Sequence, residues 1–229
     1  MVAAEAREFA GLLARCGDST RLPWGLPVAR QVRLGDSQLF LVAAGAGQKL
    51  AGRAADAAGS RLKFDAVVST GSCGGLDPAL RAGEVFVAVS VLAMDSGERY
   101  ETRAPECASP HAAGVLVSTG QVIRSVEEKK RLHALGARAV EMEASAVAAR
   151  AVAWGVPFFC VRAVADRANE ELFLDYNATR DADGGLSTAR ILAQALRHPL
   201  NLAPELYRMH RGSRLAARAL GDFLAHCRF

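Results

Sequence analysis

The chain has 229 residues, of which 51% are hydrophobic, so it is long enough and apolar enough to bury one large core. Its five cysteines are widely separated and form no CxxC pair, which argues against a disulfide framework and against a zinc or dithiol site. The formal net charge is +4, and neither the N-terminal segment nor the longest apolar run, residues 85–94, has the pattern of a signal peptide or a membrane span. We therefore expect a cytoplasmic protein with one domain over residues 1–229.

Strand-like and helix-like segments alternate along most of the chain. In chain order we expect a strand at 38–43, a helix at 49–58, a strand at 65–69, a glycine-rich loop at 71–75, strands at 84–94 and 114–118, a charged helix from Ser125, a helix at 140–154 and a buried strand at 158–165. Glu128 stands at capping-box spacing from Ser125. This alternation predicts a mixed, largely parallel sheet covered by helices, with ligands at the carboxyl ends of its strands.

Two motifs near these strand ends come close to known signatures and then depart from them. AGAGQKLAG follows a strand and opens a helix, but the third glycine of a dinucleotide fingerprint is replaced by Leu50. TGSCG resembles a nucleophile elbow, but Thr70 takes the place of its first glycine. The five histidines are scattered without metal-ligand spacing. We expect no cofactor and no metal.

The segment VEMEAS, residues 140–145, places two glutamates in a run that is otherwise apolar. On the predicted helix, side chains two residues apart point about 200° away from each other. We therefore expect one of Glu141 and Glu143 to face a ligand and the other to pair with a basic group such as Arg162. A pair that only complements the helix dipole is the alternative interpretation.

Three segments, STGSCGGLDPALRAGEV, AVEMEASAVA and VPFFCVRAVADRAN, resemble the signature segments of the nucleoside phosphorylase/nucleosidase superfamily. This group includes purine nucleoside phosphorylases and methylthioadenosine/S-adenosylhomocysteine nucleosidases. The ordered resemblance covers residues 43–169. It implies an α/β fold, a three-layer αβα sandwich on a mixed, partly barrel-like central sheet.

The resemblance also implies a reaction, the cleavage of the N-glycosidic bond of a purine nucleoside, with adenine as the expected base and a modified 5′ position. Asp166 would protonate the departing purine, and Glu143 would accept hydrogen bonds from the ribose hydroxyls beside the Met142 backbone. Glu141 would support this site. The AAEAREF segment would supply the carboxylate that orients the attacking water, with Glu8 first and Glu5 second.

Further substrate contacts are expected from the glycine-rich loop, where Ser72 and Gly74 would offer backbone donors, and from Val122 after the strand at 114–118. Adenine-specific relatives place an aromatic side chain at the position of Val122, so its loss weakens stacking on the base.

The nucleophile is expected to be water, although phosphate stays open. Hexameric purine phosphorylases carry a phosphate-binding arginine where this chain has Ser69, and the loss of such a bidentate partner favours hydrolysis. Arg53 or Arg124 could replace it, which keeps a phosphorolytic enzyme as one alternative. A non-catalytic nucleoside-binding module is another, because a fold can outlive its activity.

A basic helical extension is expected from about residue 186. From Arg190 onward, seven arginines face two acidic residues, but few aromatics accompany them, so a solvated helical face is preferred to nucleic-acid binding. The tail resembles that of the hopanoid-associated phosphorylase branch, which suggests an adenosylhopane nucleosidase as a further alternative. Its leucines could contact an anionic membrane surface, or the helices could pack on the core or on the partner of a homodimer. These leucines are Leu192, Leu196, Leu200, Leu202 and Leu206.

Overall fold

A computed structural model describes residues 1–179, 187–197 and 199–229. The expected start of the C-terminal extension near residue 186 lies outside these described residues. The strands are β1 (Val2–Ala3), β2 (Ser19–Arg21), β3 (Val28–Leu34), β4 (Ser37–Ala43), β5 (Val67–Gly75), β6 (Val85–Ala93), β7 (Arg99–Glu101), β8 (Ala112–Ser118), β9 (Ala137–Glu141) and β10 (Phe158–Asp166). The helices are η1 (Ala6–Phe9, a 3₁₀ helix), α1 (Ala10–Leu13), α2 (Gln48–Gly59), α3 (Val126–Ala134), α4 (Ala144–Trp154), α5 (Thr188–Arg197) and α6 (Pro199–Leu224).

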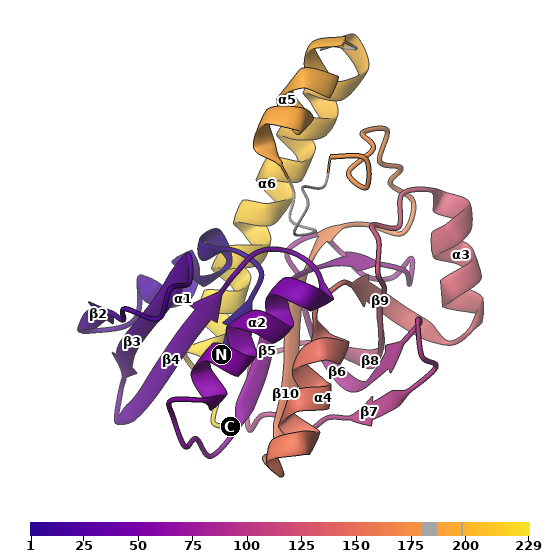
Figure 1. Cartoon of the computed structure of the whole chain (residues 1–229). Helices are drawn as coiled ribbons and strands as arrows, with labels where there is room; N and C mark the ends of the chain where they lie inside the picture. Colours follow the sequence, from indigo (N-terminus) through magenta and orange to yellow (C-terminus); the bar gives the residue numbers. More distant parts are fainter. Residues whose placement is uncertain (180–186, 198) are drawn as a thin grey trace.

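The central sheet closes on itself (Figure 1). Strand β10 pairs with β6, β6 with β8, β8 with β9, β9 with β5, and β5 again with β10, so these five strands form a barrel-like ring. Strands β1, β4, β3 and β2 extend the sheet from β5. The expected mixed, partly barrel-like sheet is therefore confirmed. The expectation that it is largely parallel is wrong, because β10 runs antiparallel to β6, β9 to β5, and the hairpins add further antiparallel pairs.

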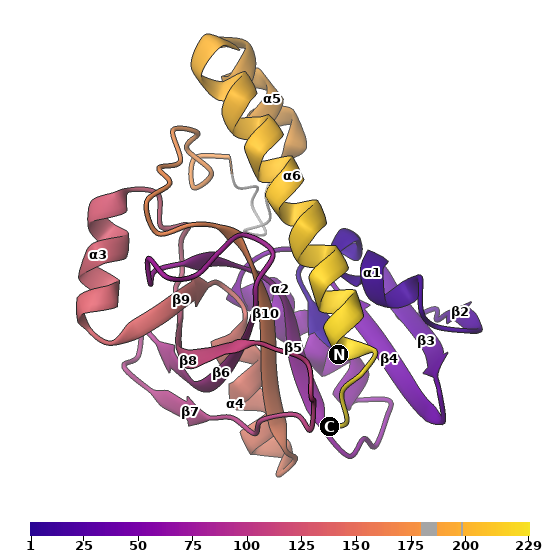
Figure 2. The ribbon, with the colours of Figure 1, turned by 180° about the vertical axis from the view of Figure 1, so that it is seen from behind.

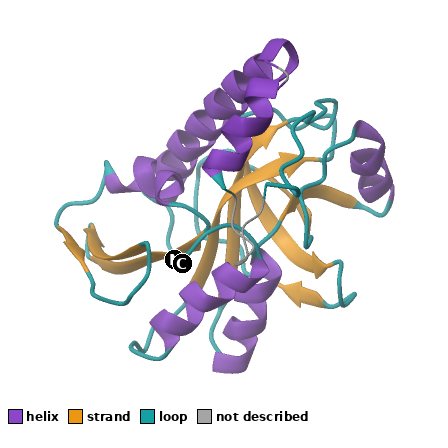
Figure 3. Ribbon diagram, turned by 45° about the horizontal axis from the view of Figure 1, so that its top comes forward, coloured by secondary structure: helices purple, strands orange, loops and turns teal. Residues whose placement is uncertain are grey.

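Helices cover both faces of the sheet, and the side chains of β10 show why. Phe158, Cys160 and Val164 belong to the apolar cluster that α2 and α4 complete, whereas Val161 and Ala163 belong to the cluster shared with α1 and α6. Successive residues of a strand point to opposite faces, so one strand serves two cores. Figure 2 shows α6 on the face away from α2 and α4, and Figure 3 shows the strands between helices. The structure is the expected αβα sandwich.

Two sequence-based boundaries are wrong. Val140 and Glu141 end a strand, β9, and the helix expected from Val140 begins only at Ala144. The Glu141 carboxylate accepts hydrogen bonds from the backbone N–H groups of Glu143 and Ala144, at 2.9 and 2.8 Å, which marks the change from strand to helix. The segment 71–75, expected as a loop, continues β5 and pairs with β10.

The C-terminal helix α6 packs on the body of the molecule with its apolar side. Ala216, Leu220 and Leu224 are buried beside Phe9 and Leu12 of the N-terminal helices. The arginines at 211, 214 and 218 are exposed, in agreement with the expected solvated face.

The five leucines expected to form a membrane-facing row do not share one exposed face. Leu202 is buried and Leu206 half-buried in a cluster with Leu172 and Leu174, whereas Leu192 is exposed. Nothing is described of the side chains of residues 196 and 200. Within the described part of the chain, no helix has the length and apolar content that crossing a membrane requires.

Candidate active site

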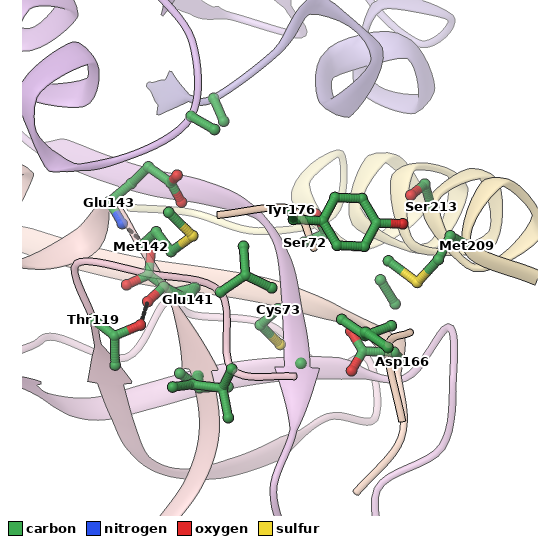
Figure 4. Close-up of a pocket in the computed structure, with 18 of the residues that line it drawn as sticks. Ser72, Cys73, Thr119, Glu141, Met142, Glu143, Asp166, Tyr176, Met209 and Ser213 are labelled. Carbon is green, nitrogen blue, oxygen red and sulfur yellow. Dashed lines mark hydrogen bonds between the residues drawn. The ribbon is translucent and has the colours of Figure 1, made fainter. Parts of the chain in front are cut away.

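A cavity of about 200 Å³ opens where several strands end. Residues at or just beyond the carboxyl ends of β1, β4, β5, β8, β9 and β10 line it, so it lies at the expected edge of the sheet. All of the expected site residues lie on its wall: Glu8, Ser72, Gly74, Val122, Glu141, Met142, Glu143 and Asp166. Figure 4 shows Met142 and Glu143 at one end of the cavity and Asp166 at the other.

At the cavity wall, Glu141 forms a buried ion pair with Arg162. The Arg162 Nη2 atom lies 2.6 Å from Glu141 Oε2, and both side chains are 1% exposed. Arg162 also donates from Nη2 to Ser69 Oγ at 2.7 Å and from Nη1 to the Thr70 carbonyl at 3.0 Å. The expected pairing of one glutamate with Arg162 is thus confirmed, although Glu141 lies on strand β9 and not on the predicted helix.

Glu143 is the second buried carboxyl of this segment, and it faces the cavity. Its Oε1 accepts a hydrogen bond from the Gly47 backbone N–H at 2.6 Å, and its Oε2 lies 4.0 Å from Arg162 Nη1. Burial, and then the nearby Glu141 charge, raise the pKa of Glu143 to about 8. Because burial makes the ionised form of Glu143 unfavourable, hydrogen-bond donors from a ligand would stabilise this form.

Glu8 is held by donors from two segments. Its Oε2 accepts from the backbone N–H groups of Ala4 and Glu5 at 2.9 and 3.1 Å, and its Oε1 accepts from the Ser72 backbone N–H and Oγ at 2.8 and 2.9 Å. Gly71 makes this approach possible, since a Cβ there would lie 2.7 Å from Glu8 Oε1. Glu5, expected as the second choice, also lines the cavity but pairs with Arg7 at 2.7 Å.

Asp166 closes the other end of the cavity, and its partner is a lysine that the sequence analysis missed. Lys129 Nζ lies 2.5 Å from Asp166 Oδ2, with the lysine side chain 1% exposed. Burial raises the pKa of Asp166, and the Lys129 ammonium opposes this rise without cancelling it. Gly74 faces the carboxyl group, and a Cβ there would lie 3.3 Å from Oδ2.

Near Asp166, the wall contains three further residues that the sequence analysis missed. Tyr176, Met209 and Ser213 lie beside Asp166 in Figure 4. Val122 packs in the same apolar cluster as Tyr176. No local sequence pattern predicted these side chains as part of the site, because Tyr176 lies in the segment after β10 and the other two lie on the distant helix α6.

The match to a known family covers most of the sheet and the site. A family model described as the phosphorylase superfamily matches residues 27–113 and 103–197. The chain belongs to the phosphorylase superfamily. This confirms the resemblance found in the three signature segments.

Proteins of known structure share the fold over nearly the whole chain. A 5′-methylthioadenosine/S-adenosylhomocysteine nucleosidase from Staphylococcus aureus is 27% identical over 172 residues, which is 63% of this chain and 75% of the relative. The solved structure of the nucleosidase of that name from Neisseria meningitidis, in complex with methylthio-immucillin-A, matches with a TM-score of 0.73 at 21% identity, covering 98% and 95% of the two chains. Futalosine hydrolase of Helicobacter pylori matches with a TM-score of 0.72 at 18% identity, covering 97% and 93%. These two structural matches show a common fold.

The raised pKa of Glu143 predicts how pH affects folding. Because the folded protein holds this proton more tightly than the unfolded chain, the proton's contribution to stability is complete below the ordinary pKa of 4.5 and is lost as pH rises through about 8. Glu143→Gln removes the titration. We expect the free energy of unfolding of this variant, measured with urea, to increase relative to that of the original protein as pH rises from 5 to 8.

Glu101→Gln, at an exposed position on β7, is the matched control and should show no such gain. A difference between Glu143→Gln and the original protein that stays constant from pH 5 to 8 would contradict the assigned titration.

Proposed function

We propose that the protein hydrolyses the N-glycosidic bond of a purine nucleoside, with adenine as the base and a modified 5′ position. The observation that carries the proposal is one cavity with three buried or anchored carboxyl groups in separate places: Asp166 at one end, Glu143 at the other, and Glu8 fixed by Ser72. The names of the relatives, nucleosidases that act on methylthioadenosine and adenosylhomocysteine, support the choice of base and 5′ position.

Asp166 is the group suited to the leaving base. A purine leaves a ribosyl carbon poorly as an anion, so it must gain a proton as the bond breaks. Burial raises the pKa of Asp166, which favours the protonated form that can donate. Asp166 would donate it to a ring nitrogen of the base.

Glu143 is the group suited to the sugar. Two vicinal hydroxyls can each donate a hydrogen bond to one carboxylate, at roughly 1.5 to 3 kcal/mol for each bond to a charged group. The Gly47 amide takes one of these acceptor positions. A bound diol would hold Glu143 ionised, with the Met142 backbone beside it, and would fix the sugar in reactive geometry.

Glu8 is the group suited to the nucleophile. Its four hydrogen bonds fix the carboxylate in place, and Ser72 Oγ, one of the donors, can also accept a hydrogen bond from a water molecule. A water held here can be deprotonated by Glu8 as it attacks a carbon that develops oxocarbenium character.

The charge of the cavity wall favours water over phosphate. Among the described lining residues, Arg7 is the one arginine or lysine, and it is paired with Glu5. Of the arginines considered for phosphate, Arg53 is exposed and does not line the cavity, and Arg124 binds the carbonyls of Leu172 and Phe173 and the Asp175 carboxylate. A phosphate dianion would meet carboxylates without a free cation to offset their repulsion.

We expect release of adenine from methylthioadenosine and adenosylhomocysteine at the same rate with and without phosphate, with free sugar as the second product. Asp166→Asn should lower kcat by about 10² to 10⁴-fold, the usual contribution of a general acid. The measurement is release of free base, with far-UV circular dichroism to show that the variant folds.

Formation of a sugar 1-phosphate that requires added phosphate would instead identify a phosphorylase. Binding of these nucleosides without any release of base would identify a non-catalytic binding module. Inosine and adenosylhopane, tested in the same assay, define the base and the 5′ group.

Tyr176 is proposed to take the stacking role for which Val122 is unsuited. It is the one aromatic side chain among the described lining residues, it is buried, and it lies beside Asp166 (Figure 4). Stacking of an aromatic ring on a base contributes about 1 to 3 kcal/mol. Tyr176→Ala should therefore lower kcat/KM about 5- to 150-fold, and adding Val122→Phe should restore part of the loss.

Tyr207→Ala is the matched control for Tyr176→Ala. Tyr207 is 71% exposed on α6 and does not line the cavity. Equal kcat/KM values for the two variants would show that Tyr176 does not contact the base.

A further inference from the structure

Lys129 is a buried lysine in a helix that otherwise carries its charges outward. Its neighbours Glu128 and Lys130 on α3 are exposed. The Lys129 ammonium lies 2.5 Å from Asp166 Oδ2, and 2.9 Å from each of the carbonyl oxygens of Arg167 and Glu170. An ammonium group has three protons, so these three acceptors can satisfy it completely.

Lys129 contacts only one oxygen of Asp166. Within the described residues, no hydrogen bond occupies the other oxygen, Oδ1, and Asp166 lines the cavity. The lysine thus fixes the carboxyl group at Oδ2 and leaves Oδ1 for a ligand. Through the two carbonyls it also holds the start of the segment that leads to Leu172 and Tyr176 on the cavity wall.

We propose that Lys129 is a positioning residue for the reaction, which presents Asp166 Oδ1 to the base and sets the pH at which Asp166 loses its proton. The assignment rests on the proposed function for the role of Asp166. The contacts of Lys129 do not depend on it.

Several groups face Asp166, and Lys129 is the strongest cationic influence among them. They are Lys129 on α3, Cys73 on β5, Arg208 on α6, and Glu170 and Tyr176 in the segment after β10. Burial raises the pKa of Asp166 most. Lys129 lowers it by charge and by hydrogen bonding, Glu170 raises it and Arg208 lowers it.

This balance matters for proton donation. A carboxyl group buried without a cation would keep its proton to high pH and would be a weak acid toward the base. A general acid is most effective when its pKa lies near the working pH. Lys129 brings Asp166 back toward that range, so it acts on the rate through Asp166 without contacting the substrate.

Loss of the Lys129 charge should raise the pKa of Asp166. Lys129→Met removes a charge that lowers the pKa of Asp166, so the protonated form persists to higher pH. We expect the alkaline limb of kcat/KM against pH to move upward by about one pH unit or more, the usual effect of an adjacent opposite charge. Lys129→Arg keeps the charge and should leave the limb within a few tenths of a unit of its original position.

Lys130→Met is the matched control, because Lys130 is exposed on the same helix, one residue away. Its limb should coincide with that of the original protein. An alkaline limb that stays in place in Lys129→Met, or that moves equally in Lys130→Met, overturns the proposal.

A second measurement does not need activity. The Asp166 carboxyl carbon, assigned in ¹³C-labelled protein by comparison with Asp166→Asn, can be titrated by NMR without ligand. Its midpoint should be higher in Lys129→Met than in the original protein, and Lys129→Gln, which keeps hydrogen-bond donors without the charge, should behave in the same way if the methionine variant fails to fold.

The two measurements separate the two ideas. A protein without nucleosidase activity that still shows the shifted midpoint would refute the proposed function and keep the role of Lys129 at Asp166. An active nucleosidase whose Asp166 midpoint is the same in Lys129→Met as in the original protein would keep the proposed function and refute the role of Lys129.

Discussion

The buried ion pair between Arg162 and Glu141 is the constraint on which the site depends. Arg162 is a full charge in the middle of an otherwise apolar strand, and it binds groups on β5 and β9 at once. Removing one partner of such a pair leaves an uncompensated buried charge and costs about 3 to 5 kcal/mol. A shift of β10 relative to β5 and β9 would separate Arg162 from these partners and carry that cost.

The register of these strands brings together, from distant segments, groups to which we assign roles in the proposed reaction. Ser72 follows Thr70, whose carbonyl accepts from Arg162; Glu143 follows Glu141; and Asp166 follows Arg162 along β10. Ser72, Glu143 and Asp166 each lie two to four residues beyond a contact of the ion pair, at the same edge of the sheet. The pair does not need to touch a ligand to decide where the ligand binds. In the same way, Lys129 fixes one oxygen of Asp166 from outside the cavity.

Much of this arrangement could be predicted from the sequence, for physical reasons that differ between residues. The capping box of Ser125 and Glu128 is local, and the structure contains it. Charges at Glu141, Glu143 and Arg162 are conspicuous in apolar runs, because burial without a partner is costly. By contrast, the helix expected at Val140 was wrong, since the alanines and valines there suit both a helix and a buried strand, and only the tertiary contacts of Glu141 decide where one gives way to the other.

Lys129 and Tyr176 could not be predicted in this way. Lys129 stands among charged neighbours on an amphipathic helix, so its burial appears only when α3 meets the segment after β10. Tyr176 packs in one apolar cluster with Val122 and with Leu202 of α6, which is distant in the sequence. Helix α6, whose leucines suggested a membrane surface, thus contributes Met209 and Ser213 to the wall of the site.

The central claim is that Asp166 and Glu143 bind opposite ends of one nucleoside. The most direct test is a crystal structure with an adenosine analogue whose N-glycosidic bond cannot be cleaved. We predict that Asp166 Oδ1 lies within hydrogen-bonding distance of a ring nitrogen of the base and that both ribose hydroxyls contact Glu143. An analogue bound with its base away from Asp166, or with its diol in solvent, would contradict the account.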